Sequence, residues 1–151
     1  MIAAGSPAAL TAAIGQTATG DWFGIDQDRI QAFADATEDW QWIHLDAGRA
    51  ASGPFGATIA HGYLTLSLLP RLTAGLLAVA GVAMVVNYGI DRVRFLQPVV
   101  VGSRVRAVVV LASVEPTAMG MRAVLATTVE IEGAERPALV ADSIALFVPE
   151  S

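Results

Sequence analysis

The chain has 151 residues, of which 54% are hydrophobic and 15% are charged, and its formal net charge is -5. This length fits one domain with a sizeable core, and the composition excludes an intrinsically disordered chain. The absence of cysteine excludes disulfides and thiolate metal sites, and an acidic balance without a basic cluster argues against nucleic-acid binding. We therefore expect a single domain over residues 1–151 of a cytoplasmic protein.

The first 14 residues are small and apolar but lack a basic segment, so they do not predict a signal peptide. We expect them to form a loosely ordered N-terminal segment. Residues 72–90 carry no charge and approach the length of a membrane span. Glycines and Asn87 interrupt this run, which favours a buried helix followed by a buried strand, with no membrane association.

A short strand is expected at residues 18–25, with Trp22 and Phe23 as its bulky contacts. A helix should follow, with Asp26 as its N-cap and its end near Thr37. Residues at the i, i+3, i+4, i+7 spacing of one helix face support it, namely Ile30, Phe33, Ala34 and Thr37.

Between this helix and residue 62 we expect only short local structure. Residues 40–43 should form a turn with both indoles packed inward and with Gln41 bonded to backbone, and residues 47–51 should form one helical turn. From Gly62 onward, leucines cover nearly every face of a helix, which predicts a long helix buried on all sides. Pro70 should kink or end it.

Four strands are expected in the second half of the chain, at residues 83–96, 104–114, 121–131 and 138–148. A turn is expected at residues 115–117. Because the links are short, neighbouring strands should pair antiparallel. One antiparallel sheet wrapped around a long buried helix is the hot-dog architecture, an α+β fold.

Asp39 and His44 are the first candidates for chemistry. Five residues along a continuous helix would place them about 140° apart, so they can act together only if the chain leaves the helix between them. A carboxylate and an imidazole held by a fixed turn can bind one water molecule and remove its proton. Spacing alone favours the alternative, in which Asp39 caps a turn and His44 bonds to backbone.

Gly62 and His61 come next. If Gly62 begins the buried helix, its N–H is one of the unpaired amides that can stabilise a negatively charged oxygen. The alternative is an ordinary tight entry to a helix, and for His61 a structural role is favoured. A metal site from His44, Asp46 and His61 would resemble that of non-haem iron proteins, but this spacing is common and we predict no metal.

The segment Asp39-Trp40-Gln41-Trp42-Ile43-His44 resembles the signature of the MaoC-like (R)-specific enoyl-CoA hydratases (hydratase 2), whose core reads Gly-Asp-x-Asn-Pro-(Leu/Ile)-His. The segment Ile59-Ala60-His61-Gly62 resembles the second block of that family, and Phe95 with Pro98-Val99 resembles its F-x-x-P-V segment. The resemblance spans roughly residues 15–148 and is closest to the nodulation-protein-N-like branch.

By this resemblance, Asp39 and His44 would be the catalytic pair, and the Gly62 amide would stabilise the oxyanion. Glu38 stands where the family has glycine, while Gln41 and Trp42 replace Asn-Pro. The acid, the histidine and their spacing are kept. These departures are therefore expected to affect substrate choice more than reaction type.

The resemblance implies a lyase that reversibly hydrates a trans-2-enoyl-CoA to an (R)-3-hydroxyacyl-CoA in fatty acid metabolism. No cofactor would be needed beyond the CoA of the substrate, and a homodimer is expected. Candidate substrate contacts are Trp42, Phe55, His61 and Tyr63, with Arg92 and Arg94 as candidates for the CoA phosphates. Two alternatives stay open, a hot-dog acyl-CoA thioesterase and a non-catalytic acyl-CoA-binding protein.

Overall fold

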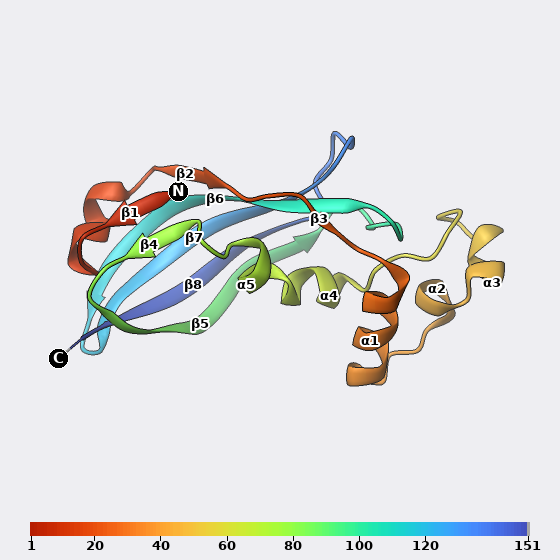
Figure 1. Cartoon of the computed structure of the whole chain (residues 1–151), viewed down its shortest axis with the longest axis horizontal. Helices are drawn as coiled ribbons and strands as arrows, with labels where there is room; N and C mark the ends of the chain where they lie inside the picture. Colours follow the sequence, from red (N-terminus) through yellow and green to blue (C-terminus); the bar gives the residue numbers. More distant parts are fainter. Residues whose placement is uncertain (151) are drawn as a thin grey trace.

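The computed structural model describes residues 1–150 and is built on one six-stranded sheet (Figure 1). Its long strands lie in the spatial order β6-β7-β8-β5, all antiparallel, and two short strands pair with the outer side of β6. The strands are β2 (Thr17–Thr19), β3 (Phe23–Gly24), β5 (Val82–Phe95), β6 (Arg104–Thr117), β7 (Gly120–Ile131) and β8 (Leu139–Pro149). The predicted single strand at residues 18–25 is thus divided into β2 and β3.

Strands β6 and β7 follow the predicted alternation closely. In β7 every second residue from Ala123 to Ile131 is buried, because successive side chains of a strand point to opposite faces. The turn expected at residues 115–117 was wrong, since β6 continues through Pro116 to Thr117. β2 pairs with β6 only at residues 108–110, so at Pro116 the other side of β6 is open and a missing N–H is tolerated.

The helical run after Gly62 is shorter than predicted and lies across the sheet as α4 (Gly62–Ser67) and α5 (Leu69–Leu72) (Figure 1). Pro70 lies at the start of α5, where a proline is accepted, and the run ends at Leu72. It is buried on one side only, because Tyr63, Ser67 and Arg71 are exposed. Its inner leucines pack against sheet residues, as in the cluster of Leu64, Leu68, Leu72, Val105, Val129 and Leu139.

Three helices gather at one end of the sheet (Figure 1), and the predicted acid and histidine lie within this segment of the chain. The helices are α1 (Gln27–Thr37), α2 (Trp42–Leu45) and α3 (Ala47–Ala51). Asp26 caps α1 as predicted, its Oδ1 accepting from the Arg29 N–H at 2.9 Å. Trp40 was expected to pack inward but is 56% exposed, with its Nε1 donating to Asp35 at 2.9 Å. The side chain of Gln41 forms no cap hydrogen bond at the start of α2.

The N-terminal segment is packed, contrary to the loose order expected of residues 1–14. Strand β1 (Ile2–Ala4) pairs in parallel with β4 (Leu77–Val79), and a 3-10 helix covers Ala8–Ala13. Ile2 and Leu10 have no exposed surface, because they close a second apolar cluster over the far half of the sheet. Burial of these side chains holds the segment in place.

Strand β5 occupies an edge of the sheet. It pairs with β8 rather than with its sequence neighbour β6, whose outer side is taken by β2 and β3. Among residues 1–150, no helix is long and apolar enough to cross a membrane, and the uncharged run at residues 72–90 divides between the end of α5, β4 and β5. The predicted α+β class, one antiparallel sheet around a central helical run, is confirmed.

Candidate active site

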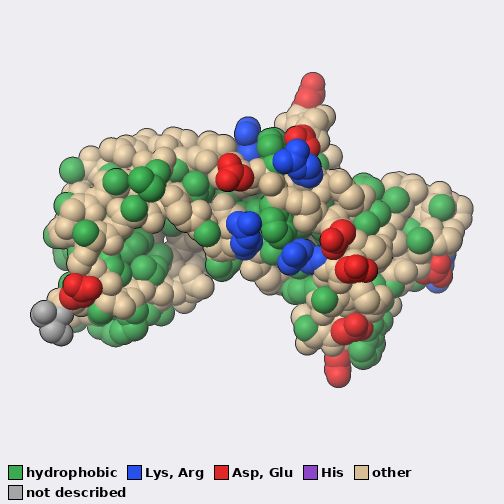
Figure 2. Space-filling view, viewed as in Figure 1, with side chains coloured by type: hydrophobic (Ala, Val, Ile, Leu, Met, Phe, Trp, Pro, Cys, Tyr) green, Lys and Arg blue, Asp and Glu red, His purple; other side chains and the backbone are tan. Residues whose placement is uncertain are grey.

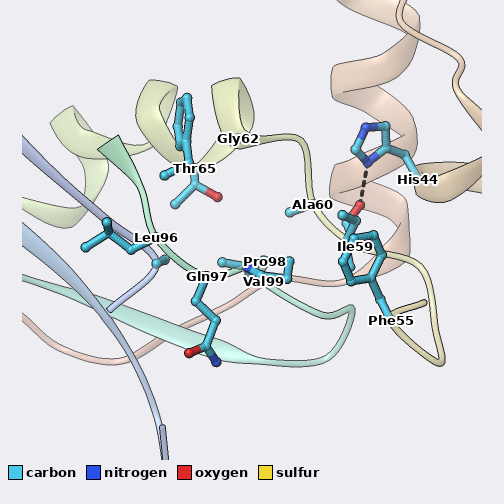
Figure 3. A pocket seen from close by; sticks show the side chains of 12 residues that line it. His44, Phe55, Ile59, Ala60, Gly62, Thr65, Leu96, Gln97, Pro98 and Val99 are labelled. Atoms are coloured by element: carbon cyan, nitrogen blue, oxygen red, sulfur yellow. Dashed lines mark hydrogen bonds between the residues drawn. The ribbon is translucent and has the colours of Figure 1, made fainter. Parts of the chain in front are cut away.

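His44 is 6% exposed, and its tautomer is fixed by one hydrogen bond. The Nδ1 atom lies 2.7 Å from the carbonyl oxygen of Ile59 (Figure 3). Because a carbonyl oxygen can only accept, Nδ1 carries the proton and Nε2 keeps its lone pair. His44 therefore presents an unprotonated nitrogen, as a general base requires.

A buried polar network holds Ile59 and His44 together. The Ile59 N–H donates to the carbonyl oxygen of Ile43 at 3.1 Å, so the two segments bind each other in both directions. The side-chain amide of Gln27 donates to the His44 carbonyl at 2.8 Å and accepts from the Thr58 hydroxyl at 2.6 Å. Gln27 was not predicted as part of the site, because a glutamine in the first turn of a helix carries no distinguishing sequence signal.

Asp39 reaches His44 because the chain leaves the helix between them. Helix α1 ends at Thr37, and Glu38 adopts a left-handed conformation with φ of 58°. The Asp39 N–H then closes the helix end on Ala34 at 3.1 Å. As a result, one carboxylate oxygen of Asp39 and one ring nitrogen of each histidine all lie within 4.8 Å of one another.

His61 contacts both of these residues and is 2% exposed. Its Nε2 lies 3.0 Å from the main-chain carbonyl oxygen of Asp39 and therefore donates to it. The rings of His44 and His61 are stacked, with centroids 3.7 Å apart and planes 23° apart, and Phe33 packs on His61 with centroids 5.0 Å apart. The Nδ1 atom of His61 is buried without a hydrogen-bond partner among the described residues.

The surroundings lower the pKa of His44 below its ordinary value of 6.5. Burial is the largest cause, because it disfavours the charged imidazolium, and the nearby His61 acts in the same direction. The hydrogen bond to Ile59 and the carboxylate of Asp39 oppose the shift. The balance keeps His44 neutral, and so available as a base, to a lower pH than a free histidine.

The residues considered for a metal site, His44, Asp46 and His61, do not form one group, because Asp39 takes the place of Asp46 in the cluster whose donor atoms lie within 4.8 Å of one another. Asp46, one of the three residues considered for such a site, caps α3 instead, its Oδ1 accepting from the Arg49 N–H at 2.9 Å.

A cavity of about 330 Å³ opens beside His44 (Figure 3). It lies between the start of α4, the chain before it and the segment that follows β5. Its lining is mostly apolar and consists of His44, Phe55, Ile59, Ala60, Gly62, Thr65, Phe95, Leu96, Gln97, Pro98, Val99 and Ala138. Phe95 and Pro98-Val99 carried the third part of the sequence resemblance, and the structure places them on this cavity.

Gly62 lies where α4 begins and where the cavity meets the ring of Phe95. A Cβ added at Gly62 would stand 3.1 Å from that ring, so only glycine fits without displacing Phe95. No partner for the Gly62 N–H is found among residues 1–150, as is usual in the first turn of a helix. Gly62 therefore lines the cavity with an amide that has no protein partner among these residues.

The other predicted site residues lie outside the cavity. Trp42 is half-buried under the guanidinium of Arg49, 4.1 Å from the ring centroid, and meets Phe55 only in a small neighbouring hollow. Tyr63 is 69% exposed and packs edge-on against Phe95. Arg92 and Arg94 were candidates for the CoA phosphates, but Arg92 is paired with Asp142 and Arg94 donates to the Val93 carbonyl at 2.7 Å.

Charged side chains on the face seen in Figure 2 gather over the middle of the molecule and over the α1 end, and no histidine is visible there. The end of the sheet near the chain termini shows few charges in the same view. Both histidines are buried, with exposures of 6% for His44 and 2% for His61.

Comparison with known proteins shows the family of this chain. The family model described as "MaoC like domain" matches residues 9–134. The chain is 52% identical over 145 residues to 3-hydroxyacyl-thioester dehydratase Z of Mycobacterium tuberculosis, covering 95% of this chain and 96% of that protein. It is 47% identical to Nodulation protein N of Rhizobium leguminosarum bv. viciae, covering 84% of this chain and 81% of that protein.

Solved structures show the same fold. The R-hydratase PhaJ1 from Pseudomonas aeruginosa superposes with a TM-score of 0.78 at 27% identity, covering 97% of this chain and 86% of that chain. The (R)-hydratase from A. caviae gives a TM-score of 0.74, also at 27% identity, covering 89% of this chain and 96% of that chain. The sheet around a helical run is therefore the hot-dog fold, and the chain is an enzyme of the MaoC-like dehydratase family.

Proposed function

We propose that this protein catalyses the reversible addition of water to a trans-2-enoyl-CoA, giving an (R)-3-hydroxyacyl-CoA, or the reverse dehydration. The observation that carries the proposal is the unprotonated Nε2 of His44, fixed by Ile59, within a cluster that includes the Asp39 carboxylate and beside a largely apolar cavity. The names of the relatives, a 3-hydroxyacyl-thioester dehydratase and two (R)-hydratases, support the reaction class and both directions.

In the proposed reaction, Asp39 and His44 hold one water molecule and take its proton as its oxygen bonds to C3 of the substrate. The electrons of the double bond move onto the thioester oxygen, and one of the two groups returns a proton to C2. Water is thereby added across the double bond with no net change in the enzyme. The chemistry requires neither a metal ion nor a redox cofactor, since the substrate carries its own CoA.

The Gly62 N–H is the proposed donor to the thioester oxygen. Negative charge develops on that oxygen as water adds, and a fixed amide directed at it stabilises the transition state more than the substrate. Loss of one such donor costs about 3 kcal/mol in enzymes where it has been measured. The location of Gly62 on the same cavity as His44 supports this role.

The apolar lining of the cavity supports an acyl substrate. Phe55, Ile59, Phe95 and Val99 give it an apolar lining suited to a hydrocarbon chain. Contacts from Trp42, Tyr63 and His61 to substrate stay predictions, as do contacts of Arg92 and Arg94 with the CoA phosphates. An acyl-CoA substrate also favours a cytoplasmic site of action.

We further propose a homodimer formed along β5. Five residues of this edge strand are large, apolar and more than one-third exposed before the strand reaches the cavity, namely Met84, Val85, Val86, Tyr88 and Ile90. Within residues 1–150 the strand pairs with β8 alone, so its outer backbone groups are free to pair with a second copy. An exposed apolar edge of this length is otherwise prone to aggregation.

Crotonyl-CoA with a thiol reagent tests the proposal against its alternatives. A hydratase removes the enoyl-thioester absorbance without releasing thiol, and chiral analysis of the product should show the (R) isomer. Release of free CoA thiol would identify a thioesterase instead. Tight binding of crotonyl-CoA and of longer enoyl-CoA chains without any turnover would identify an acyl-CoA-binding protein.

A further inference from the structure

His61 is buried beside the proposed catalytic pair but is absent from the lining of the cavity. We infer that His61 is a positioning residue, which fixes the main chain of Asp39 through its Nε2–H and the ring of His44 through stacking. The inference deepens the proposed function, since it assigns a role at the same site.

The first contact anchors the Asp39 segment. After α1 ends, Asp39 is exposed and its own N–H bonds back only to Ala34. The hydrogen bond from His61 to the Asp39 carbonyl, 3.0 Å long, connects this exposed segment to the start of α4, 22 positions further along the chain. Because Gly62 follows His61 directly, the same bond sets the distance between the carboxylate of Asp39 and the amide of Gly62.

The second contact fixes the direction of the His44 base. The hydrogen bond to Ile59 holds Nδ1 but leaves the ring free to tilt about that bond. The ring of His61, stacked at 3.7 Å and backed by Phe33 on α1, closes one face of His44. The hydrogen bond to Ile59 thus fixes the tautomer of His44, and the stacking on His61 fixes the direction in which its Nε2 points.

A structural role does not explain why residue 61 is a histidine. Its Nδ1 is buried without a partner, and a buried unpaired acceptor destabilises the folded state. A phenylalanine would fill a similar volume and avoid that penalty, but it would lose the donor to Asp39. A histidine at this position is therefore explained by the hydrogen bond that its Nε2–H donates to the Asp39 carbonyl.

Two variants separate the two contacts. His61→Phe keeps a flat ring for stacking and loses the donor, whereas His61→Gln places an N–H near the position of Nε2 and loses the ring. We expect kcat for His61→Phe to fall by about 10- to 100-fold with KM nearly unchanged, the effect of a small displacement of a reacting group. His61→Gln should recover part of that loss, and the melting temperature of His61→Phe should not lie below that of the wild type.

Wild-type kcat and KM in His61→Phe would overturn the inference while leaving the proposed function intact. A lowered melting temperature in His61→Phe, with no recovery of kcat in His61→Gln, would also overturn it, because those results describe an ordinary core residue. An inactive wild type would instead refute the proposed function, and this inference with it.

Nitrogen-15 NMR of the imidazoles provides a test that does not depend on activity. The protein has two histidines, so each signal can be assigned by replacing one of them. We expect His44 as the Nδ1–H tautomer and His61 as the Nε2–H tautomer, with His44 unchanged in tautomer in His61→Gln. An Nδ1–H tautomer at His61 would contradict the donor role and overturn the inference.

Discussion

The ring of Phe95 lies against Gly62, so closely that a Cβ on residue 62 would approach it to 3.1 Å. The end of β5 and the beginning of α4 thus meet at the point where the cavity and the proposed oxyanion donor coincide. A single methyl group placed there should alter the site without altering the fold.

Gly62→Ala is therefore expected to lower kcat/KM by about 10- to 1000-fold, the range for disturbing one oxyanion donor, with little change in melting temperature. The added methyl displaces Phe95 and crowds the thioester oxygen. Steady-state kinetics with an enoyl-CoA measures this. The double variant Gly62→Ala with Phe95→Leu should recover activity if crowding is the cause, and full activity in Gly62→Ala alone would contradict the assignment.

Glu38→Gly should stabilise the protein. Glu38 has φ of 58°, in the left-handed region, where glycine lacks the steric cost of a side chain. We expect an increase of about 0.5 to 1 kcal/mol in the free energy of unfolding, seen in denaturant titration. Thr37→Gly, one position earlier in α1, is the control and should destabilise by a similar amount. A loss of stability in Glu38→Gly would show that Glu38 makes interactions beyond its backbone conformation.

Stability should depend on pH through His44. Its pKa is lower in the folded protein than the ordinary 6.5, so below pH 6.5 the unfolded chain binds more protons than the folded one. The stability contributed by neutral His44 is therefore complete above pH 6.5 and is lost as pH falls from there through the lowered folded pKa. The free energy of unfolding, measured by denaturant titration from pH 8 to 5, should fall more steeply in wild type than in His44→Asn. Equal slopes would contradict this.

The exposed edge strand β5 leads to a prediction about the oligomeric state. Val85 is 53% exposed on β5, so Val85→Lys should leave the fold intact but prevent pairing of two copies along this strand. Light scattering is expected to show a dimer for wild type and a monomer for Val85→Lys. Met119→Lys, at a residue that is 62% exposed in the turn between β6 and β7, is the matched control and should remain a dimer. A monomeric wild type would refute the proposed interface.

Local features of the fold were predictable because their causes are local. The cap at Asp26 depends on residues three apart, and the strands β6 to β8 on alternation with short links. The pairing of β5 with β8 was not predictable, since it depends on β2 and β3 occupying the other side of β6. The prediction of a long helix buried on all sides was wrong for a related reason. Composition does not reveal that only one side of the leucine-rich run packs against the sheet.

In the candidate site, too, some features were predictable from the sequence and others were not. Asp39, His44 and Gly62 were predicted from a turn and from a family resemblance, both of which can be read in consecutive residues. The contacts that hold them join residues 31 and 22 positions apart, from Thr58 to Gln27 and from His61 to Asp39. No periodicity records such pairs, so the supporting network becomes visible only in the folded chain.

The most direct test of the account is the loss of enoyl-CoA absorbance measured for wild type, Asp39→Asn and the control Asp35→Asn. Asp35 lies on α1 near the site, but its Oδ1 accepts from Trp40 and Gln31 and takes no part in the cluster with His44. Wild type and Asp35→Asn should hydrate the substrate at similar rates, while Asp39→Asn should be slower by about 100-fold or more. Hydration by Asp39→Asn at the wild-type rate would contradict the central claim that Asp39 and His44 act together on water.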